Sequence, residues 1–142
     1  MQYTVGTAGI SLIEDGGGVV IVDTGYGLEA SPDAWDTILA GLGRPVTRII
    51  VTHCHPDHLG LAQWLSEKPG APVTMTLGEF LGGHALWNQL PGYNTTAMVT
   101  QFRQHGLDGE RCNALASRGN AYKRGFPSLP ARYARVIGGD SL

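Results

Sequence analysis

Three of the five histidines of this 142-residue chain lie within six positions, together with a carboxylate. The stretch spans residues 52–58 and reads Thr-His-Cys-His-Pro-Asp-His. Imidazole and carboxylate groups are the usual ligands of divalent metals, and each gives up hydration and core packing when it joins such a cluster. The spacing therefore predicts a metal site. The alternatives are surface histidines that open a helix, or a lone structural zinc.

Two predicted elements position this cluster. Residues 48–51 form a short β-branched run that indicates a buried strand, and residues 59–67 carry apolar side chains at helical spacing. The cluster then lies on a strand-to-helix loop at the carboxyl end of a sheet, where α/β proteins usually place their sites. The first two histidines, two positions apart on an extended segment, should point the same way. The Asp-His pair follows where the chain turns into the helix and can approach from another side.

The pattern His-x-His-x-Asp-His resembles that of the metallo-β-lactamase-fold hydrolases. The resemblance implies that His53 and His55 hold one metal, that Asp57 and His58 hold a second, and that Asp57 is the catalytic residue that orients the nucleophile. It implies two zinc ions in the intact enzyme, although iron and manganese also accept this ligand set. Metal-activated hydroxide would attack an ester, thioester, lactone or related bond.

A second motif precedes the cluster. Residues 8–14 and 19–23 are predicted strands joined by a hairpin at residues 15–18, and the second strand runs into Asp-Thr-Gly. The resemblance extends to this motif, and implies that Asp23 supports the metal loop through a hydrogen bond to a ligand histidine. From the residue alone, an Asp-Gly turn with local backbone bonds explains it equally well, and both interpretations stay open.

The remaining pattern predicts a layered α/β domain. A helix over residues 31–42 and a strand over residues 73–76 complete an alternation of strands and helices around the metal loop, as in βαβ units. The resemblance implies the N-terminal half of an αββα sandwich, as a single partial domain over residues 1–142. Residues 77–118 are expected to be a helical insertion within it. The further predicted elements are three helices and a last strand, over residues 77–90, 95–106, 108–118 and 131–137.

Substrate contacts are expected from the insertion and from the segment after it. Trp87 lies on an aromatic helix face, which is usually core but can wall a pocket beside a metal site. Residues 119–130 are rich in glycine and proline and are predicted to be a loop, whose Tyr122, Lys123 and Arg124 could close over a substrate. The alternative for these three residues is a connecting loop with solvated charges.

Composition sets further bounds. The hydrophobic content of 42% and the net charge of −2 are those of a globular protein. Residues 1–102 hold three Lys/Arg against nine Asp/Glu, and residues 103–142 hold seven against three, without a basic groove for nucleic acid. His84 and His105 are expected on helix faces, and Cys54 as a small buried filler. No apolar run approaches about 20 residues, so we expect a cytoplasmic protein without membrane contact.

The family's downstream ligands, which the resemblance places in a second half, are not found in this chain. We therefore expect a hydrolase that acts on small molecules. Whether this chain alone is active stays open. We also expect it to form a homo-oligomer or to pair with a complementary half. One alternative is a non-catalytic metal-binding half-domain that needs a partner chain. Another is an iron-dependent oxidoreductase of the same superfamily.

Overall fold

The computed structural model describes residues 2–5 and 8–141. Over these residues the chain forms one mixed sheet with the strand order β1-β2-β3-β4-β5-β6. The strands are β1 (Gln2–Val5), β2 (Ala8–Asp15), β3 (Gly18–Val22), β4 (Val46–Ile50), β5 (Val73–Thr76) and β6 (Ala134–Val136). The helices are α1 (Ser31–Leu42), α2 (Pro56–Leu59), α3 (Ala62–Glu67), α4 (Leu77–Trp87), α5 (Thr95–Gln104), α6 (Gly109–Ser117) and α7 (Ala121–Gly125).

The sheet changes from antiparallel to parallel at β3. Strands β1, β2 and β3 pair antiparallel, whereas β3 with β4, β4 with β5 and β5 with β6 pair parallel. Parallel neighbours need a crossover connection, and the helices supply it: α1 follows β3, α2 and α3 follow β4, and α4 to α7 follow β5. The carboxyl ends of β3 and β4 therefore meet at one edge of the sheet.

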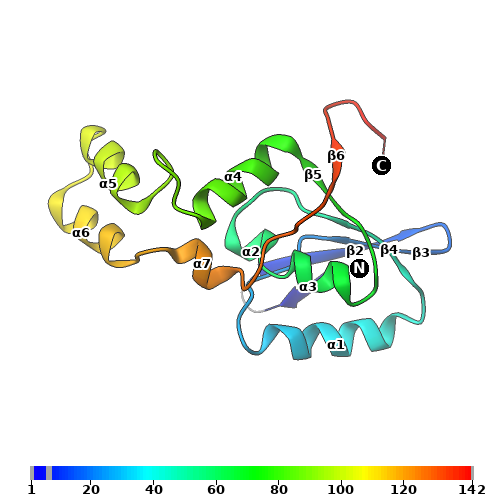
Figure 1. The fold of residues 1–142 in the computed structure, drawn as a ribbon. Coiled ribbons are helices and arrows are strands. Elements are labelled where there is room, and N and C mark those ends of the chain that lie inside the picture. Colours follow the sequence, from blue (N-terminus) through cyan, green and yellow to red (C-terminus); the bar gives the residue numbers. More distant parts are fainter. Residues whose placement is uncertain (1, 6–7, 142) are drawn as a thin grey trace.

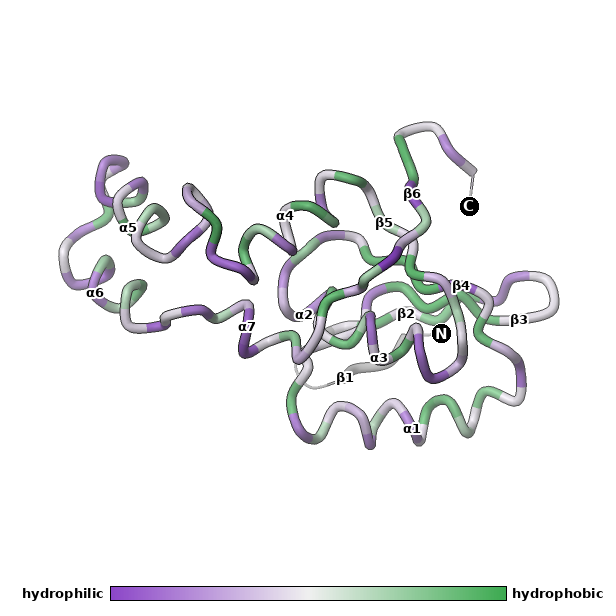
Figure 2. The backbone as a smooth tube through the Cα atoms, in the orientation of Figure 1, coloured by the Kyte–Doolittle hydropathy of each residue, from purple (hydrophilic) through white to green (hydrophobic). Residues whose placement is uncertain are grey.

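The core lies between one face of this sheet and the helices that pack on it. Side chains with no exposed surface include Ile21 and Ile49 from the strands and Trp35 from α1. On the opposite face, Ile13 is 52% exposed and Ile50 is half-buried. In Figure 1, α1 and α3 lie along the same side of the sheet. Figure 2 shows that hydrophobic residues concentrate in the strands, while α5 and α6 are a mixture of hydrophilic and hydrophobic residues.

The predicted α/β class is confirmed, and several elements differ from the predictions in their boundaries or in their type. The helix predicted over residues 59–67 is instead two helices, because Pro56 starts α2 at the metal loop and a break follows Leu59. The loop prediction is wrong for Ala121–Gly125, where the Asn120 side chain accepts a hydrogen bond from the Lys123 amide and caps α7. Strand β1 was not predicted.

The segment predicted as a helical insertion is helical. Helices α4, α5 and α6 lie within residues 77–118, and α5 and α6 extend away from the sheet as a pair (Figure 1). That this segment is an insertion within one domain stays a prediction. No helix in the described part of the chain is long and apolar enough to cross a lipid bilayer.

Candidate metal centre

The ends of β3 and β4 carry the two sequence motifs, and backbone contacts hold them together. The Asp23 amide donates to the Ile50 carbonyl at 2.8 Å. The Thr24 amide and hydroxyl both donate to the His58 carbonyl, at 2.9 Å and 2.7 Å. Gly60 is required here, since a Cβ at this position would lie 2.3 Å from the Gly25 carbonyl oxygen. The end of α2 is therefore fixed against the end of β3.

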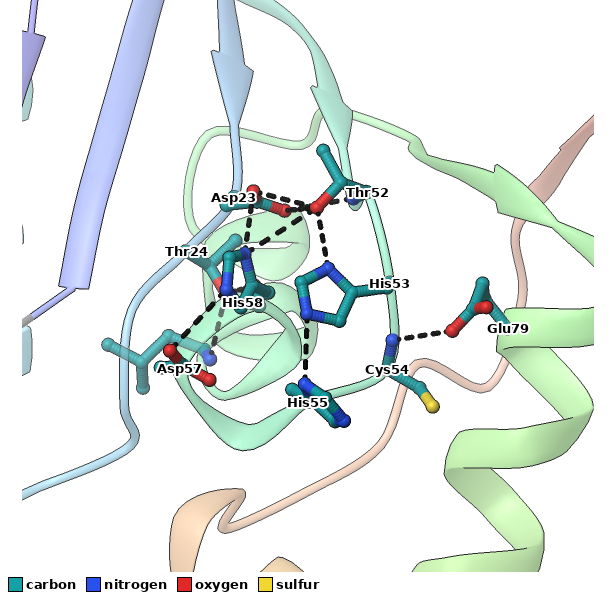
Figure 3. Close-up of polar contacts among 10 residues, drawn as sticks. Asp23, Thr24, Thr52, His53, Cys54, His55, Asp57, His58 and Glu79 are labelled. Atoms are coloured by element: carbon teal, nitrogen blue, oxygen red, sulfur yellow. Dashed lines mark hydrogen bonds and ion pairs between the residues drawn. The ribbon is translucent and has the colours of Figure 1, made fainter.

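His53 and His55 present one pair of nitrogen donors. Their Nε2 and Nδ1 atoms are 3.0 Å apart, and the rings meet edge to face with centroids at 4.6 Å. Two nitrogens bound to one tetrahedral zinc, each with a bond of about 2.0–2.1 Å, lie about 3.3 Å apart. The separation of the two atoms is that of a hydrogen bond between the rings, and it is also close to the separation of two ligands on one ion (Figure 3).

Asp57 and His58 present a second pair of donors. The Asp57 Oδ2 atom is 3.4 Å from His58 Nε2, again close to the separation expected of two ligands on one tetrahedral ion. The two pairs are neighbours, because the rings of His53 and His58 have centroids 3.9 Å apart. In the described ranges, no three His, Cys, Asp or Glu side chains converge as a complete metal site. The donors are arranged as two pairs.

Asp23 and Thr52 contact the Nδ1 atoms of His58 and His53, which are the ring nitrogens outside the donor pairs. The Asp23 Oδ2 atom lies 2.8 Å from His58 Nδ1, and Asp23 Oδ1 accepts from the Thr52 amide at 2.8 Å. The Thr52 hydroxyl lies 2.9 Å from Asp23 Oδ2 and 3.0 Å from His53 Nδ1. When Nδ1 of His58 donates to this carboxylate, its Nε2 keeps the lone pair that a metal needs.

Asp23 itself has an unusual backbone conformation. Its φ is +62°, and its side chain is buried. A left-handed conformation in a residue other than glycine costs on the order of 1–3 kcal/mol, although aspartate tolerates it better than most. The hydrogen bonds of the carboxylate offset this cost, and they reach Thr52 and His58, 29 and 35 positions along the chain. A local Asp-Gly turn requires no such contacts.

The electrostatic setting of His53 suits a metal ligand. Burial, and then the neighbouring His58 and His55, lower the pKa of His53 below the usual value for histidine. Its imidazole is therefore neutral at pH 7. A neutral ring is the form that binds metal ions.

Comparison with known proteins agrees with this geometry. Residues 4–90 match the family model of the metallo-beta-lactamase superfamily. The chain belongs to this superfamily.

Solved structures of metallo-β-lactamase proteins give the same result. A beta-lactamase domain protein from Burkholderia ambifaria is 34% identical over 94% of the chain, with a TM-score of 0.68. A metallo-beta-lactamase family protein from Thermus thermophilus is 31% identical over 99% of the chain, with a TM-score of 0.65. The chain spans 37% and 44% of the lengths of these two proteins, so it matches part of their fold. No functionally curated protein matches the chain.

Two residues contact the metallo-β-lactamase motif without having been predicted from the sequence. Thr52 directly precedes the cluster, and its hydroxyl beside a predicted ligand was the signal that could have found it. Glu79 is 25 positions away from Cys54, yet its Oε2 accepts from the Cys54 amide at 2.8 Å. Burial, and then the interaction of the thiol itself with the Glu79 carboxylate, raise the pKa of the Cys54 thiol to about 12. The thiol is therefore protonated at neutral pH.

Of the four predicted substrate-pocket residues, Tyr122 lies beside the metallo-β-lactamase motif, and Trp87 and Lys123 contact each other. The Tyr122 ring is 6.5 Å from the His55 ring, measured between centroids. The Lys123 Nζ atom lies 4.7 Å from the centroid of the Trp87 ring. Arg124 extends towards Gly119, 3.7 Å from where a Cβ at that glycine would be. Burial is also the main cause that raises the pKa of Tyr122, so its hydroxyl is neutral at pH 7.

The two histidines outside the motif make other contacts. The Nε2 atom of His84 lies 3.2 Å from the Pro130 carbonyl oxygen, and its ring packs on Phe80 with centroids 4.5 Å apart. His105 directly follows the last residue of α5 and is exposed. His84 lies within α4, as predicted, whereas His105 caps the end of α5 instead of lying on its face.

Proposed function

We propose that the segment from His53 to His58 binds two divalent metal ions, zinc foremost, and serves a metal-dependent hydrolase. The observation that carries this proposal is the pairing of donors: His53 Nε2 with His55 Nδ1 at 3.0 Å, and His58 Nε2 with Asp57 Oδ2 at 3.4 Å. Both distances are near the donor separation of about 3.3 Å on a tetrahedral ion. Membership of the metallo-β-lactamase superfamily supports the same conclusion.

In this proposal four residues bind the ions, and two others orient the histidine ligands. His53 and His55 hold the first ion, and Asp57 and His58 hold the second. Asp23 keeps the proton of His58 at Nδ1, and Thr52 orients His53 from the same side. Bound ions would supply Lewis-acid activation of water and stabilisation of negative charge on the substrate oxygen. Asp57 would orient the attacking water.

The substrate we propose is a small molecule with an ester, thioester, lactone or related bond. Tyr122 supplies aromatic surface near the first donor pair, since its ring lies 6.5 Å from that of His55 between centroids. Lys123, the residue after Tyr122 in α7, holds its ammonium group over the Trp87 ring and supplies a positive charge. This combination favours a substrate with an apolar part and a negative charge.

Each ion needs ligands beyond its pair. A catalytic zinc usually has three protein ligands and one open position, and each pair supplies two. We propose that the further ligands come from another polypeptide segment, supplied by a second copy of this chain or by a complementary half. Sedimentation with and without zinc tests this. Zinc-dependent association supports it, and a monomer that holds zinc with nanomolar affinity contradicts it.

The experiment that tests the metal proposal is a measurement of metal content and affinity. We expect zinc to co-purify with the chain, to be removed by a chelator, and to rebind in competition with a chelating dye. His53→Ala should abolish retention of the first ion, and Asp57→Ala that of the second. Equal zinc binding by both variants and the wild-type chain would refute the proposed ligands.

A second candidate is redox chemistry with iron at the same residues. A protein whose structure was solved in a di-iron-bound form shares the fold, with a TM-score of 0.61 at 20% identity. Imidazole and carboxylate donors also suit iron. Iron in the freshly purified protein, with oxygen uptake that depends on it, would favour this candidate over hydrolysis.

A further inference from the structure

The N-terminus of helix α4 resembles a capping box, but its glutamate accepts a hydrogen bond from outside the helix. Thr76 is the N-cap, and its hydroxyl accepts from the Glu79 amide. In a complete capping box, the glutamate three positions after the cap returns to the cap's own amide. Here the Glu79 carboxylate instead accepts from the Cys54 amide at 2.8 Å, in the middle of the metal loop.

The location of this hydrogen bond gives it a specific effect. Cys54 separates His53 from His55, so its peptide determines how the two flanking side chains are presented. Successive side chains of an extended segment point to opposite sides. In Figure 3 the Cys54 side chain points away from the two imidazoles, and Glu79 reaches the loop from α4. A carboxylate acceptor makes this bond stronger than one between neutral groups.

Two consecutive glycines bring α4 close enough for this contact. Glycine lowers helix stability relative to alanine, so a pair of glycines inside a short helix calls for a packing reason. A Cβ at Gly83 would lie 2.9 Å from Leu59 Cδ2 and 3.3 Å from Cys54 Cβ, and one at Gly82 would lie 3.5 Å from Cys54 Sγ. The helix therefore packs directly against the back of the metal loop.

We propose that Glu79 is a positioning residue for the first metal, which holds the Cys54 amide so that His53 and His55 present their donors 3.0 Å apart. This inference rests on the proposed function, since it gives Glu79 a role in metal binding. It differs from a purely electrostatic role, in which the negative charge of Glu79 would attract the ion from a distance. It also differs from a purely structural role in starting α4.

Three variants of the full chain separate these roles. Glu79→Ala removes the hydrogen bond and the charge, and we expect a loss of zinc affinity of about 10- to 100-fold in dye competition, the usual effect of removing a group that supports a ligand. Glu79→Gln removes the charge but keeps an acceptor oxygen, so it should recover most of the affinity. Glu110→Ala removes an exposed first-turn glutamate from α6, and zinc affinity should not change.

Two spectroscopic readings show whether the effect is on position. In the metal-free chain, the Cys54 amide should be protected from hydrogen exchange in the wild-type chain and in Glu79→Gln, and exposed in Glu79→Ala. With Co²⁺ in place of zinc, Glu79→Ala should weaken the visible absorption of a tetrahedral ion, and Glu79→Gln should restore it.

The outcomes separate the failure of this inference from that of the proposed function. Equal zinc affinity in the wild-type chain and Glu79→Ala refutes the role of Glu79 but not the proposed function. Equal losses in Glu79→Ala and Glu79→Gln refute positioning in favour of charge. An unprotected Cys54 amide in the wild-type chain refutes the hydrogen bond itself. A wild-type chain that protects this amide but binds no divalent metal refutes the proposed function, and the role of Glu79 with it.

Discussion

Replacement of Asp23 by asparagine is the most direct test of how the metal loop is organised. The substitution keeps the size of the side chain, and asparagine tolerates the left-handed backbone at φ +62° at least as well as aspartate. One amide oxygen can still accept from the Thr52 amide. The NH₂ group then faces His58 Nδ1, where the carboxylate oxygen lay at 2.8 Å. Two donors would face each other across this contact.

The expected effect follows from these contacts. His58 can relieve the conflict by moving its proton to Nε2, which removes the lone pair directed to the second metal. Loss of a group that supports a metal ligand typically costs about 10- to 100-fold in affinity, or about 1.4–2.7 kcal/mol. The buried charged hydrogen bond is lost as well, so the free energy of unfolding without metal should fall by about 1–3 kcal/mol.

The assay is zinc competition with a chelating dye, together with urea denaturation of the metal-free protein. Asp33→Asn is the matched control, because Asp33 is exposed in the first turn of α1, and it should change stability by less than about 0.5 kcal/mol. If Asp23→Asn binds zinc as tightly as the wild-type chain, Asp23 does not set the tautomer of His58.

Three further predictions concern the surroundings of the site. Gly60→Ala places a Cβ 2.3 Å from the Gly25 carbonyl oxygen, so urea denaturation should show a loss of about 1–3 kcal/mol, and an unchanged midpoint would contradict the packing described. Trp35→Phe leaves the buried Thr24 carbonyl without its indole donor at 2.9 Å and should cost about 1–3 kcal/mol in the same assay. Because the pKa of Cys54 is raised to about 12 and only the thiolate reacts, iodoacetamide labelling of Cys54 followed by mass spectrometry should be slow at pH 7 and rise about tenfold per pH unit up to pH 10. A rate that levels off near pH 8 would refute the raised pKa.

The position of the metal loop could be predicted because its signals are local. The β-branched run before His53 indicates a strand, and alternation along an extended segment places the two histidines on one side. The hairpin at residues 15–18 is equally local and is confirmed by the pairing of Asp15 with Gly18. Each of these predictions needs only residues within a few positions of one another.

What could not be predicted depends on how distant segments meet. The contact of Glu79 with the Cys54 amide exists only because α4 follows β5, which lies beside β4 in the sheet. Helix α7 forms in a stretch with many glycines and prolines because Asn120 caps it, and Gly125 lets it approach Pro56. A Cβ at Gly125 would lie 2.4 Å from Pro56 Cβ, a restriction that spacing along the chain does not reveal.

These close approaches have a common consequence for the site. Gly60, Gly83 and Gly125 each let another segment lie against the metal loop where a methyl group would collide. Backbone packing and the hydrogen bonds of Asp23 and Glu79 therefore hold the loop and the side chains on it. Contacts of this kind order the loop through the chain itself, unlike a zinc finger, where binding energy is spent on folding. The loss of a single support such as Glu79 or Asp23 should therefore reduce metal affinity without unfolding the domain.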